Sequence, residues 1–173
     1  MAIQIRHAVP ADAALLSDIE RSAGALFRIL PDLAWIADHQ VMSAEAHLAR
    51  IAEGTVWVAQ DERASLIGFL TAQGAGDELH IWELSVHAGH QGRGVGRQLM
   101  EAAEAYARRT GISALTLTTF RGVPWNEPFY ARLGFETQEG AAIGERLSAL
   151  LRDEVLHGLP GERRCAMRRI LHT

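Results

Sequence analysis

Residues 90–97 read HQGRGVGR and place glycines at alternate positions, Gly92, Gly94 and Gly96. The preceding segment ELHIWELSV is rich in β-forming residues and ends at Val86, whereas the hydrophobic residues after Gly94 recur at helical spacing. The glycines therefore lie where a strand gives way to a helix. At such a junction, successive backbone N–H groups and the positive end of the helix dipole can face an anion. The stretch predicts a phosphate-binding turn.

Other glycine-rich phosphate motifs fit this turn less well. A P-loop requires a lysine followed by serine or threonine after its last glycine, whereas Gly96 is followed by Arg97 and Gln98. The dinucleotide-binding pattern G-x-G-x-x-G fails from either starting glycine, because its last position falls on Arg97 or Leu99. A glycine-rich connection that serves only steric needs stays open as the alternative, and for one isolated Gly-x-Gly it would be the better interpretation. Three glycines at this junction favour the anion site.

Outward from the turn, strand and helix patterns follow one another without an internal repeat. One helix is expected to begin after Ser43 as its N-cap and to carry Leu48 and Ile51 on one face. The order indicates a mixed α/β (α+β) fold in a single domain over residues 1–173, not a repeated βαβ array. Strands are expected near 3–8, 55–60, 65–73, 78–86, 113–120 and 163–171, and helices near 12–24, 43–54, 94–111, 124–134 and 143–158.

Composition narrows the class of protein. The chain has 173 residues, 48% of them hydrophobic, which is enough for one sizeable core. Cys165 is the single cysteine and no targeting or membrane-spanning segment is recognised, so a reducing cytoplasm and no membrane partner are expected. The formal net charge of -4 disfavours a nucleic-acid partner. His87 and His90 have no cysteine or acidic ligand alongside them, so no metal is expected.

Two segments resemble the GNAT superfamily of N-acetyltransferases. The first, ELSVHAGHQGRGVGRQLMEAAEAYA, contains the pattern Gln/Arg-x-x-Gly-x-Gly/Ala at Gln91, Gly94 and Gly96, and the second is NEPFYARLGF. The resemblance covers residues 79–136, and the chain from 137 onward matches only loosely. Ala88 stands where many relatives carry proline, a difference expected to alter the turn more than the function.

The resemblance implies a fold and a co-substrate. The fold would be a GNAT-like central, mostly antiparallel sheet flanked by helices, with a V-shaped opening between the ELSV and LTLTTF strands. The co-substrate would be acetyl-CoA, with its pantetheine arm bonded by main chain like a short extra strand and its pyrophosphate in the glycine turn. The residues expected to bind it are Leu84, Ser85, Val86, Gln91, Gly92, Arg93, Gly94, Val95, Gly96, Arg97 and Asn126.

Acetyl transfer to an amine requires a proton acceptor and a proton donor. Glu83 lies among apolar residues in the middle of a strand, where an ionised carboxylate is costly unless paired or useful, and alternation places it on the face of Ser85. We therefore expect Glu83 to be the base, with an ordered water chain or a structural ion pair as alternatives. By the resemblance, Tyr130 would donate a proton to the leaving thiolate, the alternative being a packing role for its ring.

The acceptor is expected to bind the irregular apolar segment between the first two helices. Phe27, Trp35 and His39 are candidates there, with Arg121 and Trp125 from the other side, and Arg121 would select a carboxylate-bearing acceptor.

The sequence therefore predicts an acetyl-CoA-dependent N-acetyltransferase that acts by direct attack in a ternary complex. The acceptor would be a primary amine of a small molecule, peptide or protein. A non-catalytic acyl-CoA-binding sensor or regulatory subunit is the alternative, and transfer to a hydroxyl also stays open. Homodimers are frequent among relatives, and the C-terminal helix and strand are where two copies would pair.

Overall fold

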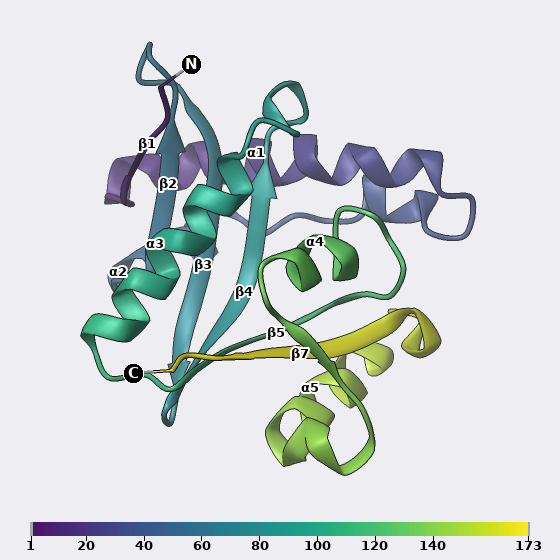
Figure 1. The fold of residues 1–173 in the computed structure, drawn as a ribbon. Helices are drawn as coiled ribbons and strands as arrows, with labels where there is room; N and C mark the ends of the chain where they lie inside the picture. The colour runs from purple at the N-terminus through teal and green to yellow at the C-terminus, as the bar shows by residue number, and fades with distance from the viewer. Residues whose placement is uncertain (1, 173) are drawn as a thin grey trace. The chain divides into compact units, whose positions relative to one another are not determined.

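The computed structural model of the protein describes residues 2–172. The order of strands and helices along this range is largely the one that the sequence patterns indicate (Figure 1). The strands are β1 (Gln4–His7), β2 (Val56–Gln60), β3 (Leu66–Ala75), β4 (Glu78–Val86), β5 (Ala114–Phe120), β6 (Glu136–Gln138) and β7 (Arg164–Ile170). The α-helices are α1 (Ala13–Gly24), α2 (Ala44–Ala52), α3 (Val95–Arg109), α4 (Glu127–Arg132) and α5 (Gly144–Leu156).

The strands form one sheet in the order β1-β2-β3-β4-β5-β7-β6. The pairs β1–β2, β2–β3, β5–β7 and β6–β7 are antiparallel, whereas β4 and β5 run parallel. The parallel pairing extends from Glu78 opposite Ala114 to Ile81 opposite Leu117 and ends before either strand does. The expected mixed α/β fold with a mostly antiparallel sheet is confirmed.

The chain divides into two compact units, and β4 contributes to both. One unit comprises the chain up to Gln73 together with Glu83–Ala105, and the other comprises Gly74–Trp82 and the chain from Tyr106 onward. The single domain over 1–173 stays a prediction. Within residues 2–172, none of the helices combines the length and hydropathy that crossing a bilayer requires.

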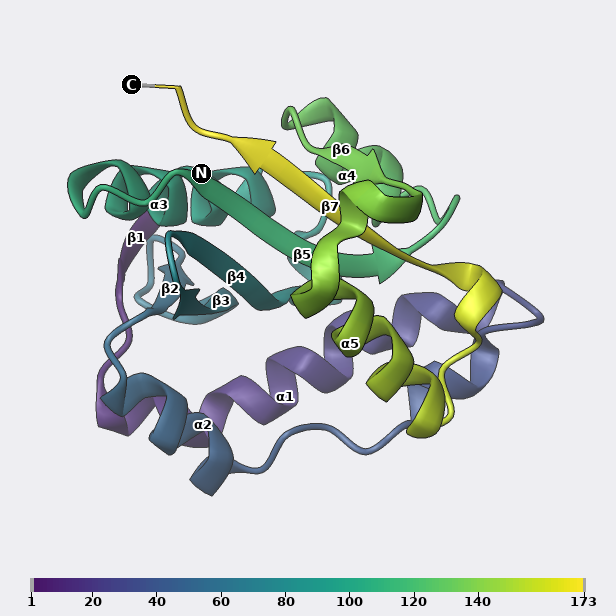
Figure 2. The same cartoon turned by 90° about the horizontal axis from the view of Figure 1, so that it is seen from below.

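In the first unit, helices cover both faces of the sheet (Figure 2). A Cβ atom on Gly68 would lie 3.1 Å from Val95 Cγ1, so α3 packs closely against β3 at this glycine. The next residue, Phe69, faces the other way and joins a buried cluster with Leu16 of α1 and Ile51 of α2. The alternation of side chains along β3 thus separates the layer of α3 from the layer of α1 and α2.

The helix α2 confirms its predicted start but not its predicted buried face. The Ser43 hydroxyl accepts a hydrogen bond from the Ala46 N–H at 3.1 Å, as an N-cap does. Leu48 is exposed, and His47 is buried beside Ile51 instead. The His47 ring contacts Phe69 edge-on, and its Nε2 lies 3.4 Å from Glu20 Oε2 of α1. Leu48 was expected on the same face as Ile51, but His47 takes the buried position there. The reason is that the His47 side chain has the Phe69 ring and the Glu20 carboxylate to contact.

In the second unit, α5 contributes charged side chains to a polar network on the β-sheet. The carboxylate of Glu78 accepts hydrogen bonds from Arg146 of α5 at 2.7 Å and from Arg168 of β7 at 2.9 Å. Arg146 also donates to the Thr116 hydroxyl at 2.8 Å. The same hydroxyl lies 3.0 Å from His80 Nδ1, so the buried imidazole is part of this network.

This network predicts how stability depends on pH. Burial of the ring, and secondarily the charge of Arg146, lower the pKa of His80 to about 4, against about 6.5 in an unfolded chain. The unfolded state therefore takes up a proton first, and the free energy of unfolding should fall by roughly 3 kcal/mol between about pH 6.5 and pH 4. The pKa of Asp12 is held below its usual value by Arg6, so Asp12 adds its loss only at lower pH.

The measurement is urea unfolding of the wild type and His80→Gln across pH 4–7. The glutamine variant does not titrate in this window, and its slope should be much shallower. An equal slope in both proteins would contradict this role of His80.

Candidate functional site

The candidate base lies near the end of β4, in the first unit. Glu83 is half-buried, and its Oε1 accepts a hydrogen bond from the hydroxyl of Ser85 at 2.5 Å. Ser85 is 3% exposed, so it holds the carboxylate from the buried side. The predicted common face of Glu83 and Ser85 is confirmed, and Leu84 and Val86 complete this half-buried strand end.

The glycine turn has the backbone that its sequence indicates. Gly92 and Gly94 adopt φ angles of +71° and +82°. Residues that have a Cβ atom rarely adopt this left-handed backbone conformation. A Cβ at either position would have no heavy atom within 4 Å beyond its chain neighbours, so conformation and not space requires glycine here. Val95 opens α3 directly afterwards, and the first N–H groups of a helix have no acceptor within the helix. These groups are donors suited to a phosphate.

Side chains brace the loop that carries the turn. The Gln91 amide donates to the Val86 carbonyl at 3.0 Å, and the His87 ring accepts from the Gly89 N–H at 3.1 Å. The Ala88 N–H donates to the hydroxyl of Ser22 at 3.0 Å, which ties the loop to the last turn of α1. Gln91, expected to bind the co-substrate, therefore also fixes the strand end to the turn.

The arginines of the turn are both exposed. Arg97 donates from Nε to Glu101 Oε1 at 2.9 Å, an ion pair one helical turn apart. Such exposed pairs contribute little and exchange readily. Binding of phosphate by Arg93 and Arg97 stays a prediction, and for Arg97 it requires exchange of the Glu101 contact.

The second unit holds the other predicted residues on and before α4. Tyr130 is buried, and its ring contacts Phe129 and Phe135 at centroid distances of 5.1 and 5.8 Å. Asn126 is the N-cap of α4, and its Oδ1 is buried with no hydrogen-bond partner among residues 2–172. An unpaired buried carbonyl oxygen is costly, and a ligand N–H group would remove that cost. Pantetheine amides carry such groups, so the residues present fit coenzyme A.

Arg121 interacts with acidic side chains of its own unit. Its Nη1 donates to Glu139 at 2.9 Å, and this hydrogen bond raises the pKa of the guanidinium further. The loop from Arg121 to Trp125 is held by Glu127, which accepts from the Gly122 N–H at 2.8 Å and from the Thr137 hydroxyl at 2.9 Å. The predicted selection of a carboxylate by Arg121 would have to compete with Glu139.

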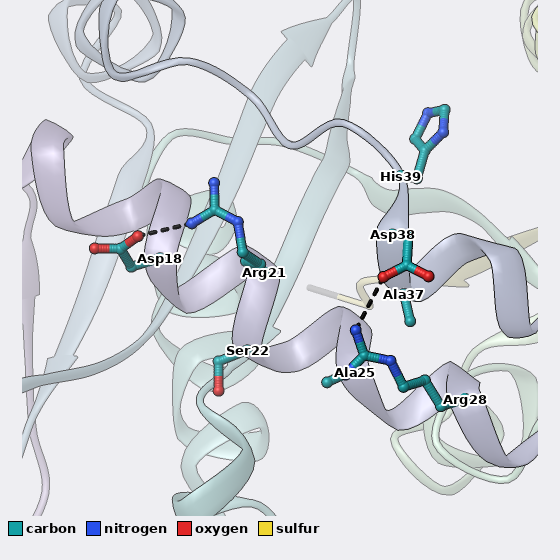
Figure 3. Close-up of a pocket in the computed structure, with 8 residues that line it drawn as sticks. All are labelled: Asp18, Arg21, Ser22, Ala25, Arg28, Ala37, Asp38 and His39. Carbon is teal, nitrogen blue, oxygen red and sulfur yellow. Dashed lines mark hydrogen bonds and ion pairs between the residues drawn. The ribbon is translucent and has the colours of Figure 1, made fainter.

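The segment predicted to bind the acceptor folds into two 3-10 turns, η2 (Ala25–Ile29) and η3 (Ala34–Asp38). Phe27 is buried, and Trp35 is exposed with its ring edge-on to His39 at 5.7 Å. Beside these turns lies a cavity of about 550 Å³, which we call the α1 pocket (Figure 3). Its lining consists of Asp18, Arg21, Ser22, Ala25, Arg28, Ala37, Asp38 and His39.

The charged members of the α1 pocket were not predicted from the sequence. Arg21 pairs with Asp18 at 2.8 Å on α1, and Arg28 of η2 pairs with Asp38 of η3 at 2.9 Å (Figure 3). Arg28 and Asp38 interrupt the apolar segment between the first two helices with charges of opposite sign, and this interruption could have indicated a charged pocket. Among residues 2–172, no group of three or more histidine, cysteine or acidic side chains is arranged to hold a metal ion.

Comparisons with known proteins identify the family and the fold of this chain. A family model described as an acetyltransferase (GNAT) domain matches residues 52–137. PaiA N-acetyltransferase from Thermoplasma acidophilum, solved with coenzyme A, superposes with a TM-score of 0.72 at 18% identity, covering 99% of this chain and 100% of that chain. The ribosomal-protein-S18-alanine N-acetyltransferase from Escherichia coli superposes with a TM-score of 0.70 at 16% identity, covering 99% and 96%.

The N-acetylglutamate synthase from Neisseria gonorrhoeae, solved with coenzyme A and N-acetyl-glutamate, has a TM-score of 0.72 at 20% identity; 100% of this chain matches 36% of that chain. The matched family model identifies residues 52–137 as an acetyltransferase (GNAT) domain, and the similar structures share its fold. The chain belongs to the GNAT superfamily.

Proposed function

We propose that the protein transfers the acetyl group of acetyl-CoA to a primary amine of a small molecule, peptide or protein, by direct attack in a ternary complex. The observation that carries the proposal is the Glu83 carboxylate, held by buried Ser85 on the strand that leads into the glycine turn. Two similar structures are a ribosomal-protein-S18-alanine N-acetyltransferase and an N-acetylglutamate synthase, and both names are in line with an amine acceptor.

In this mechanism the amine nitrogen forms a bond to the thioester carbonyl carbon while Glu83 accepts a proton from the amine, directly or through water. Main-chain N–H groups of Leu84–Val86 would bind the pantetheine arm and polarise the carbonyl. The carbon–sulfur bond then breaks, and Tyr130 donates a proton to the leaving sulfur. The products are the N-acetyl amide and the free thiol of coenzyme A.

Cys165 supports direct attack over an acyl-enzyme. Its side chain is buried, and burial raises the pKa of the thiol to about 11. A thiol that stays protonated at neutral pH is a poor nucleophile.

Location in the cytoplasm, organisation as a single domain and assembly as a homodimer remain predictions from the sequence.

The test is release of free thiol from acetyl-CoA against a panel of amines. Thiol release that depends on the amine would support the enzyme. Tight binding of acetyl-CoA by calorimetry, with no release on any amine, would favour the non-catalytic binding module instead.

The glycine turn gives a separate prediction for binding. Gly94→Ala forces a Cβ into the φ of +82°, at a cost of roughly 1 kcal/mol or more, which the turn can relieve by moving the start of α3. We expect acetyl-CoA affinity to fall by about tenfold. The matched control is Gly76→Ala, in the β3–β4 turn, where φ is +65° and a Cβ likewise meets no atom within 4 Å. If calorimetry finds equal affinity in both variants, the turn does not bind the co-substrate.

A further inference from the structure

We propose that Ser22 of α1 is a positioning residue for the co-substrate: its hydroxyl holds the loop between β4 and the glycine turn in the place that acetyl-CoA binds. This inference rests on the proposed function, since the ligand of the turn is the pyrophosphate of acetyl-CoA. It adds to that site a residue from outside both motif segments, 66 positions away from the loop residue that it contacts.

The loop is flexible by its own sequence. Residues 88–96 contain four glycines, Gly89, Gly92, Gly94 and Gly96, and no proline. Glycine loses more conformational freedom on ordering than any other residue. If such a loop became ordered only when the ligand arrives, the free energy of ordering would oppose binding. A contact that orders the loop beforehand therefore raises the affinity for the ligand.

Hydrogen bonds to the loop come from two sources. The Gln91 amide donates to the Val86 carbonyl within the same stretch of chain, so this contact fixes the shape of the loop. The Ala88 N–H donates instead to the Ser22 hydroxyl at 3.0 Å, and α1 is a separate element of the first unit. Ser22 therefore fixes where the loop lies relative to the layer of α1.

The helix α1 is a firm anchor for this contact. Leu16 and Ile19 of the helix are buried in the cluster that includes Phe69 of β3. One turn before Ser22, the hydroxyl of Ser17 donates to the Met42 carbonyl at 2.7 Å and ties the helix to the chain before α2. A hydrogen bond from α1 to the loop thus connects the loop to the packed core.

The backbone at Ala88 shows why the loop uses a hydrogen bond. Ala88 begins the 3-10 turn η4 (Ala88–His90), and the first position of a helical turn suits proline. His87 before it has a ψ of 135°, within the range that a residue preceding proline adopts. Proline would restrain the loop through its ring but has no N–H to donate. Alanine lacks the ring and has the N–H, so Ser22 supplies the restraint from outside.

The first test is Ser22→Ala. We expect the Kd of acetyl-CoA by calorimetry, and its KM in thiol release, to rise by about two- to tenfold, the usual effect of one hydrogen bond. The kcat at saturating acetyl-CoA should stay within about twofold, because Ser22 contacts no reacting atom. In the ligand-free protein, amide hydrogen exchange of residues 87–97 should become faster.

The matched control is Ser17→Ala, which removes another hydroxyl hydrogen bond of the same helix. Because Ser17 contacts the chain before α2 and not the loop, this variant should change neither acetyl-CoA affinity nor the exchange of residues 87–97.

A second variant tests the coupling of the two residues. Ala88→Pro removes the N–H and fixes φ at about −65°. With Ser22 present it should weaken acetyl-CoA binding, because the ring then lies against a hydroxyl that has lost its donor. In the Ser22→Ala background it should restore affinity, because the ring supplies the missing restraint. This change of sign in a double-mutant cycle would show that the two residues act on each other.

Unchanged affinity and exchange in Ser22→Ala would overturn the inference, and so would a lower free energy of unfolding without weaker acetyl-CoA binding. If the wild type does not bind acetyl-CoA, the proposed function fails and the inference fails with it. If the wild type binds but turns over no amine, only the proposed acetyl transfer fails, because calorimetry and hydrogen exchange still decide the role of Ser22.

Discussion

Replacing Glu83 with glutamine lowers kcat by about 10²- to 10⁴-fold, the usual contribution of a positioned general base. Glutamine has nearly the same shape and its side-chain oxygen can still accept the hydrogen bond from Ser85, so the strand is undisturbed. It cannot accept a proton from the amine. Acetyl-CoA affinity, measured by calorimetry, should stay within about twofold because the carboxylate has no proposed contact with the co-substrate.

Two further measurements separate this role from a structural one. A carboxylate base makes kcat/KM fall at low pH, and this fall should disappear in the glutamine variant. Ser85→Ala should lower kcat less than Glu83→Gln does, because the base remains but loses the group that orients it. Ser17→Ala is its control, since that hydroxyl donates to the Met42 carbonyl at 2.7 Å in the same unit. A Glu83→Gln enzyme with nearly full kcat would assign the base to another group reached through water.

The local parts of the site were predictable from sequence. The turn Gln91–Gly96 needs left-handed backbone at Gly92 and Gly94, and only glycine adopts this readily, so the residue types reveal the conformation. The common face of Glu83 and Ser85 follows from strand alternation alone. In both cases the information lies within a few consecutive residues.

The parts that depend on distant residues were not predictable. The face of α2 was assigned to Leu48, but His47 is buried because Glu20 and Phe69, from other elements, surround it. The strand β6 was missed because its three residues are all polar and show no alternation of apolar and polar side chains, and pairing with β7 is what makes it a strand. The α1 pocket forms only when η2 and η3 fold beside α1, and neither 3-10 turn has a strong hydrophobic pattern.

Replacing Tyr130 with phenylalanine lowers kcat by about 10²-fold or more if its hydroxyl protonates the leaving thiolate. Tyr130 is buried, and a phenylalanine ring preserves its ring contacts with Phe129 and Phe135. The free energy of unfolding should therefore change little compared with the loss of rate. Tyr106→Phe on α3 alters the other tyrosine of the chain and is the matched control.

The pH dependence of this defect identifies the proton donor. A thiolate needs no proton to leave once the pH exceeds the pKa of a free thiol, about 8.5, so the loss caused by Tyr130→Phe should shrink as pH rises above that value. A hydroxyl that only orients the co-substrate would give a loss that is constant with pH and accompanied by weaker acetyl-CoA binding. An unchanged kcat with a lower unfolding free energy would leave Tyr130 as a packing residue, and the thiolate would then take its proton from water.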